Sequence, residues 1–232
     1  MNFLAHYYAA TRLQTAAAPL PAYAVGTALP DFLSLAAPRT RLRLPLLGQS
    51  SATAADLALT AGVFSHLTTD TAFHKSPAFA EAQVLASRLL KQAGFIGIRV
   101  RRFFVAHILV ELALDAALLR SDPALGEEFY AAFGAADFGS IALWTEDAVS
   151  RPLPDLPYVL ERFADARYLL HYHSNDGVAE GLSRLCIRAR QDGFEEENFT
   201  HLSCVVGEMV SSLRPQMAAL LSEAAHPPTI LK

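Results

Sequence analysis

Ionisable side chains interrupt apolar helical stretches of this sequence at four places. Two of the places hold a single residue, His6 or Asp31. The other two each hold three residues spaced four apart: His66, Asp70 and His74, then His107, Glu111 and Asp115. A step of four residues advances about 40° around a helix, so each trio lies along one face. Imidazole and carboxylate groups on facing helices are typical ligands of a divalent metal ion.

Burial explains why this pattern indicates a cation. A lone buried carboxylate takes up a proton or strains the fold, so several of them need a compensating positive charge. A bound divalent ion supplies that charge and also lowers the pKa of a coordinated water. We therefore expect the ionisable side chains to meet around a shared ion. The sequence has no cysteine pair at zinc spacing, which argues against a thiolate structural site.

Ordinary structural roles remain open for each of these residues. A hydrogen-bonded core position, a helix cap or a favourable place in the helix dipole would each account for one of them. These alternatives apply to His6, Asp31, Asp70, His74, His107 and Glu111. Asp115 could face solvent.

Composition narrows the class of protein. The 232 residues are 52% hydrophobic and 18% charged, which excludes intrinsic disorder, and the net charge of -4 gives no reason to expect a nucleic-acid partner. The most hydrophobic stretch, 103–119, contains three ionisable residues, so we expect no membrane insertion. Residues 1–6 lack the basic leader of a signal peptide, and we interpret Cys186 and Cys204 as buried thiols in a reducing compartment. These features predict a cytoplasmic protein.

Apolar residues recur at three- and four-residue spacing, and strand signals are scarce. The sequence therefore predicts an all-α, single-domain multi-helix bundle over residues 1–232. A connector at 38–51 and a proline-rich hinge at 151–157 lie within it. Helices are expected over 2–13, 25–35, 53–74, 77–92, 98–120, 123–134, 158–172, 176–191 and 195–224.

Several segments resemble the acyl carrier protein phosphodiesterases, also called acyl carrier protein hydrolases. The opening Met1–His6 is similar to that family's amino terminus, and Gly26–Phe32 is similar to its Gly-Asn-Leu-Leu-Ala-Asp-Phe stretch. His66 and Asp70 match its His-Arg-x-Ile-Asp element. Likeness of placement extends to Tyr168–Leu170, the arginine-bearing helix 184–190 and Arg214–Met217, so it covers nearly the whole chain.

The resemblance implies a helical fold related to the HD-type metal-dependent phosphohydrolases. It also implies a manganese-type ion, with Mg²⁺ or Fe as alternatives, that assists removal of 4'-phosphopantetheine from a serine of acyl carrier protein. Asp31 falls on the family's catalytically important aspartate, and we expect Asp31, His66 and Asp70 to be catalytic. Ligand or water-orienting roles are assigned to Asp31, His66, Asp70 and Glu111. His6, His74 and His107 would add ligands or protonate the leaving group.

The chain also departs from the family pattern. His74 lies near the position of a family aspartate, and His107, Glu111 and Leu112 replace an aspartate and a later Asp-His pair. Leu67 replaces the arginine beside His66. These changes leave two alternatives open: a hydrolase of a small nucleotide or phosphoester, or a non-enzymatic helical binding module that has lost the metal chemistry.

An acidic carrier protein would need a locally basic docking surface. Two arginine clusters are candidates for substrate binding: Arg39, Arg41 and Arg43, then Arg99, Arg101 and Arg102. Each cluster could equally be an ordinary solvated face. His171 and His173 are interpreted as helix-end residues outside the site.

Overall fold

The computed structural model describes residues 1–14, 20–37, 40–42, 53–95, 102–189, 194 and 196–225. No strand is present among these residues, which confirms the all-α prediction. The helices are α1 (Phe3–Tyr8), continued by a π-helical turn (Ala9–Leu13), α2 (Pro21–Gly26), α3 (Leu29–Ala36), α4 (Ala54–Lys75), α5 (Pro77–Gln92), α6 (Arg102–Ser121), α7 (Ala124–Gly134), α8 (Phe138–Val149), α9 (Leu156–Ala166), a 3-10 segment (Tyr168–His173), α10 (Asn175–Arg188), α11 (Glu196–Leu213), a 3-10 turn (Arg214–Gln216) and α12 (Met217–Ala225).

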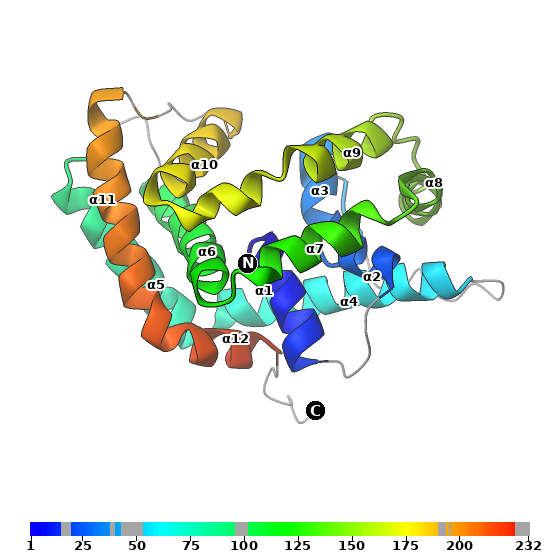
Figure 1. The fold of residues 1–232 in the computed structure, drawn as a ribbon, viewed down its shortest axis with the longest axis horizontal. Coiled ribbons are helices and arrows are strands. Elements are labelled where there is room, and N and C mark those ends of the chain that lie inside the picture. The colour runs from blue at the N-terminus through cyan, green and yellow to red at the C-terminus, as the bar shows by residue number, and fades with distance from the viewer. Residues whose placement is uncertain are drawn as a thin grey trace.

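Helix α6 lies between α5 and α11 on one side and α1 and α7 on the other (Figure 1). It contacts α1, α5, α7, α10 and α11. The buried apolar side chains from α1 to α12 form one contiguous core, in which Leu109, Leu112 and Leu114 of α6 are almost fully buried. Within the described part of the chain, no helix is both long and apolar enough to cross a membrane. Of the other helices that carry predicted ligands, α1 packs directly against α6, whereas α4 packs against α1, α2 and α3.

Two glycines allow α2 and α4 to touch through their backbones. A Cβ atom built on Gly62 would lie 2.4 Å from the Tyr23 carbonyl oxygen, and one on Gly26 would lie 2.4 Å from the Leu59 carbonyl oxygen. Any side chain at these positions would force the helices apart. The close approach places the turn after α2 beside the buried His66 of α4.

Local capping signals in the sequence located several helix ends correctly. Thr53 and Asp56 form the predicted capping box at the start of α4, and Ser76 accepts a hydrogen bond from the Phe79 amide at the start of α5. Gly94 follows α5 in the left-handed conformation with φ of 84°. These ends depend on local chemistry, and local chemistry is readable from sequence.

Other predicted boundaries were wrong. The helix expected over 25–35 is two helices, with Pro30 in the first turn of α3. The helix expected over 158–172 ends at Ala166, because Arg167 adopts a left-handed conformation with φ of 46°. Pro215 ends the regular α11 hydrogen bonding, so 195–224 is also divided. Helix α8 was not predicted at all.

The two cysteines differ in burial. Cys186 is buried, as predicted, whereas Cys204 is exposed. Helix α11 turns Leu202, Val205 and Val206 towards the core, and Cys204 lies on the opposite face. The prediction for Cys204 was therefore wrong, because an apolar neighbourhood in sequence does not fix the face of a helix.

The predicted connector and hinge lie between helices. Most of the connector 38–51 falls outside the described residues. Within the hinge 151–157, Leu153 is buried and its amide donates to Glu146 Oε1 at 2.6 Å, and α9 begins at Leu156. The hinge is thus anchored to the core through Leu153 and to α8 through Glu146.

Candidate metal centre

The predicted ligands come together from α1, α3, α4 and α6, but they form two clusters instead of surrounding one point. The first cluster consists of His6, Asp31 and His66, and the second consists of His74, His107 and Glu111. Within each cluster one ligand atom from every residue lies within 4.8 Å of the others. Both clusters could therefore hold a metal ion, and the expectation of a single shared ion is replaced by two candidate positions.

The tautomer of His6 follows from its hydrogen bonds. His6 is 1% exposed, and its Nδ1 lies 3.1 Å from Thr69 Oγ1. The Thr69 hydroxyl donates to the Ser65 carbonyl oxygen at 2.8 Å, so it accepts from His6 Nδ1. The neutral His6 ring therefore has its lone pair on Nε2.

His66 is held in the same tautomer. Its Nδ1 lies 2.7 Å from the Thr27 carbonyl oxygen, which only accepts hydrogen bonds, so His66 Nε2 also has a lone pair. That atom is 3.8 Å from Asp31 Oδ1. The rings of His6 and His66 stack with their centroids 3.7 Å apart. Backbone or hydroxyl acceptors that fix Nδ1 are typical of histidines that bind metal through Nε2.

The buried Nε2 of His6 has no hydrogen-bond partner among the described residues. Asp70 Oδ1 is 3.6 Å away, which is too long for a hydrogen bond. Buried polar atoms without a partner are rare and costly, and an ion is one explanation for them. The donor set of the first cluster therefore fits a divalent cation.

Asp70 lies between the two clusters. Its Oδ1 accepts from the α-ammonium of Met1 at 2.8 Å, and its Oδ2 is 3.2 Å from His74 Nδ1. The same ammonium donates to Glu111 Oε1 at 3.2 Å. Asp70 therefore faces His6 on one side and orients His74 on the other.

The pKa values follow from burial and from these contacts. Burial raises the pKa of Asp31 to about 8, with the Met1 ammonium opposing the shift, and lowers the pKa of His6 to about 4. For His74, burial is outweighed by interactions with Asp70 and Glu111, which raise its pKa to about 9. Burial is likewise outweighed for Asp70, whose pKa falls below its ordinary value beside His6, His74 and the ammonium.

Asp115 is not solvent-facing. It is 0% exposed and caps α1 from α6: its Oδ2 accepts from Asn2 Nδ2 at 2.8 Å and from the Leu4 amide at 3.1 Å, and its Oδ1 accepts from the Ala5 amide at 2.8 Å. Burial raises its pKa to about 7. The role could not be predicted from spacing, because the capped helix lies more than 100 residues away in the sequence.

Replacing Asp115 by alanine is expected to lower the free energy of unfolding by about 2–4 kcal/mol, because two amides at the start of α1 lose their acceptor. Urea unfolding measures the change. Asp115→Asn retains one acceptor oxygen and should lose less. An alanine variant as stable as the parent protein would show that the cap does not contribute to stability.

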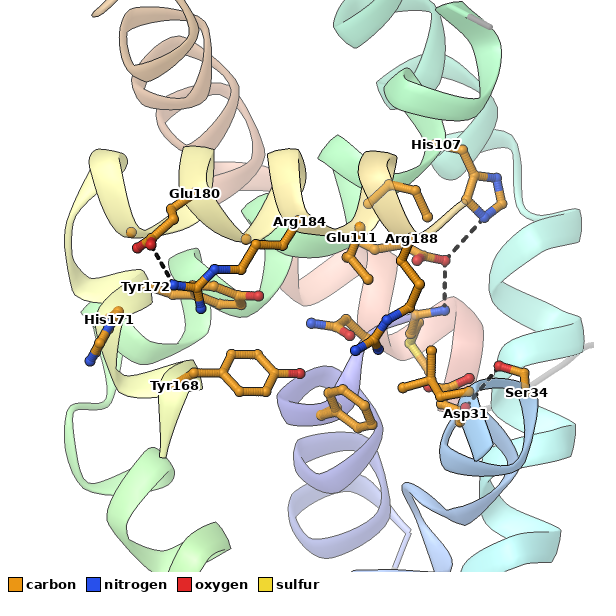
Figure 2. A pocket seen from close by; sticks show the side chains of 18 of the residues that line it. Asp31, Ser34, His107, Glu111, Tyr168, His171, Tyr172, Glu180, Arg184 and Arg188 are labelled. Carbon is orange, nitrogen blue, oxygen red and sulfur yellow. Dashed lines mark hydrogen bonds and ion pairs between the residues drawn. The ribbon is translucent and has the colours of Figure 1, made fainter. Parts of the chain in front are cut away.

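A cavity of about 490 Å³ opens beside the clusters. Asp31, His107 and Glu111 lie at one end, and His171, Glu180 and Arg184 lie at the other (Figure 2). Apolar and aromatic side chains also line the cavity: Phe3, Leu35, Ile108, Tyr168, Tyr172 and Leu185. The cavity therefore has a metal-type end and a far end that carries polar groups, and its lining also includes apolar and aromatic side chains.

Sequence reasoning did not assign the arginines of α10 to the site. Arg184 and Arg188 both line the cavity, and Arg184 is paired with Glu180. Arg188 extends from α10 into the space between the two ends (Figure 2). Their four-residue spacing on a predicted helix was the available signal. His171 also lines the cavity, at the end away from the two clusters.

Of the arginines that were predicted to bind substrate, Arg41 alone has a described side chain, and it does not line the cavity. Arg41 is exposed and donates to the Thr40 carbonyl oxygen at 2.9 Å. Arg39, Arg43, Arg99 and Arg101 lie outside the described residues, as does the Arg102 side chain. A docking role for these two clusters therefore stays a prediction.

No protein-family model, curated protein or solved structure matches this chain.

Proposed function

We propose that this protein is a metal-dependent hydrolase of phosphoesters. One observation carries the proposal: a single cavity has imidazole and carboxylate ligands on one wall and two arginines on another. The ligand wall consists of Asp31, Asp70, His74, His107 and Glu111, and the buried His6 and His66 lie behind it. When bound there, a divalent ion supplies a Lewis acid for phosphoryl oxygens and lowers the pKa of a coordinated water.

The arginines supply the complementary charge. A guanidinium binds two phosphoryl oxygens at once through paired N–H groups, and it stays protonated at any pH of interest. Arg188, which extends into the cavity between its ends, is the better placed of the two to hold a phosphoryl group. Arg184 is partly occupied by Glu180 and serves the far end.

The shape of the cavity supports a phosphopantetheine carrier as the substrate. Beyond His171, Gly177 and Glu180 the cavity borders a second groove, which includes His173 and Phe199. A linear arm could lie along the apolar and aromatic part of the cavity lining and leave through this groove. Manganese remains the ion proposed for this reaction, and an acidic acyl carrier protein remains the proposed partner.

The test uses the full chain with a carboxy-terminal tag, because the Met1 amino group is buried against Asp70 and Glu111. Metal-stripped protein is incubated with Mn²⁺ and either bis-p-nitrophenyl phosphate or holo-acyl carrier protein. We expect Mn²⁺-dependent release of nitrophenol and conversion of the carrier to its apo form by mass spectrometry. Nitrophenol release without carrier conversion would indicate a small phosphoester substrate. No turnover and no thermal stabilisation by Mn²⁺ would indicate a binding module.

Arg188→Ala is expected to raise KM for the phosphodiester by about 10-fold or more, because a charge-assisted hydrogen bond to the phosphoryl group is lost. Initial rates over a range of substrate concentrations measure the change. Arg162→Ala removes an exposed arginine of α9 that does not line the cavity, and it should leave KM unchanged. Equal kinetics for the two variants would remove Arg188 from the substrate site.

A further inference from the structure

The two clusters differ in their access to the cavity. His74, His107 and Glu111 all line it, whereas Asp31 is the only member of the first cluster that does. His6 and His66 are 1% and 4% exposed and lie behind the cavity wall. An ion in the second cluster would therefore face the cavity directly, and an ion among the ligands of the first cluster would be reached only from the side of Asp31 and Asp70.

The ligand atoms of the second cluster form a nearly equilateral triangle. His74 Nε2 is 3.1 Å from His107 Nε2 and 3.0 Å from Glu111 Oε1, and His107 Nε2 is 3.1 Å from the same oxygen. Nitrogen and oxygen ligands bind first-row divalent ions at about 2.1 Å, and ligands at right angles around such an ion lie about 3.0 Å apart. The triangle thus has the dimensions of one face of an octahedron.

The orientation of His74 also fits a ligand role. Its Nδ1 lies 2.9 Å from the Asp70 carbonyl oxygen and 3.2 Å from Asp70 Oδ2, so this nitrogen holds a hydrogen and Nε2 points to the triangle. A carboxylate that accepts from the far nitrogen of a histidine is the usual support for a metal-binding imidazole. Asp70 therefore supports the second cluster while its other oxygen faces the first.

We propose that the second cluster binds the divalent ion that meets the substrate, and that its two imidazoles select first-row transition ions such as Mn²⁺, Fe²⁺, Co²⁺ or Zn²⁺ over Mg²⁺. Two imidazoles and one carboxylate form a donor set that suits these ions, whereas Mg²⁺ prefers oxygen ligands alone. Three ligands on one face leave the opposite coordination positions open towards the cavity. The identity of the substrate rests on the proposed function, but binding of the ion does not.

Cobalt is the probe, because its visible absorption reports its ligands. Metal-stripped full chain is titrated with Co²⁺, and bound metal per chain is measured after gel filtration. Inorganic phosphate is then added as a probe of the open positions. Excess Mg²⁺ should leave the bound Co²⁺ in place. The variants are His107→Ala and Glu111→Gln, with His201→Ala, an exposed histidine of α11, as the control.

We expect each site variant to lose one bound Co²⁺ per chain, or to bind it at least about 100-fold more weakly, and to lose the phosphate-induced change in the spectrum. The His201→Ala protein should behave as the parent. Two site variants keep the test decisive if one of them fails to fold. Parent-like metal content and phosphate response in His107→Ala and Glu111→Gln would overturn the proposal. The three side chains of the second cluster would then be linked by hydrogen bonds alone. Displacement of Co²⁺ by Mg²⁺ would overturn the selectivity.

Failure of this inference is distinguishable from failure of the proposed function. Phosphoester hydrolysis that persists in His107→Ala with unchanged metal content would leave the function standing and remove the second cluster from it. If the variant loses Co²⁺ but the parent protein hydrolyses no phosphoester, the metal site is supported and the proposed function is excluded.

Discussion

Replacing Asp70 by asparagine should strongly reduce metal-dependent hydrolysis and weaken metal binding at both clusters. Asp70 Oδ1 faces His6 Nε2 at 3.6 Å, and Asp70 Oδ2 orients His74 through its Nδ1 at 3.2 Å. An amide supplies one neutral oxygen and one donor, so either the Met1 ammonium or His74 Nδ1 loses its acceptor, whichever way the amide is turned. Loss of a supporting carboxylate alone costs about 10–100-fold in metal affinity or activity, and Asp70 serves two sites.

The expected fall in kcat/KM for Asp70→Asn is therefore at least about 100-fold. Initial rates with Mn²⁺ and metal content per chain measure it, and thermal melting checks the fold. Asp56→Asn provides the matched control, since it makes the same change on α4 at the exposed capping box far from both clusters. An Asp70→Asn protein that turns over like the Asp56→Asn protein would exclude Asp70 from the centre.

The spacing of residues on α4 predicted their face correctly but not their grouping. His66, Asp70 and His74 do line one side of α4. A helix rises about 1.5 Å per residue, however, so His66 and His74 are separated by about 12 Å along its axis. Two ligands so far apart cannot bind the same ion. One therefore joins the first cluster, the other joins the second, and Asp70 lies between them.

What the sequence could not supply was the partner of each side chain across the fold. Asp115 shares the four-residue spacing of His107 and Glu111, yet it caps α1 instead of facing the cavity. Arg184 and Arg188 have the same helical spacing, and here the packing of α10 turns them towards the cavity. Periodicity predicts which residues share a helix face. Which element that face meets depends on contacts between distant segments, such as the Gly26–Gly62 approach.

Metal affinity is expected to rise steeply with pH. Asp31, with a pKa of about 8, and His74, with a pKa of about 9, both hold a proton at pH 7 in the metal-free protein. A metal ion binds only the deprotonated forms, so an ion in the first cluster must release the Asp31 proton and an ion in the second cluster must release the His74 proton. Each released proton makes affinity rise about tenfold per pH unit below its pKa, which gives about 100-fold between pH 6 and 8 for one proton. His6, with its pKa of about 4, is neutral throughout and contributes nothing to this dependence.

The same shift determines how stability changes with pH. The folded-state pKa of Asp31 lies above its ordinary value of 3.8, so its protonated form stabilises the metal-free fold at low pH, and this contribution is lost as pH rises towards 8. Over the same pH interval the metal-bound form becomes more stable relative to the metal-free form. The increase in melting temperature on adding Mn²⁺ should therefore be larger at pH 8 than at pH 6, and calorimetry in buffers of different ionisation enthalpy should detect proton release at pH 7. Asp31→Asn should reduce that release, because it removes one of the two protons. A pH-independent affinity in the parent protein would mean that neither carboxyl nor imidazole contacts the ion.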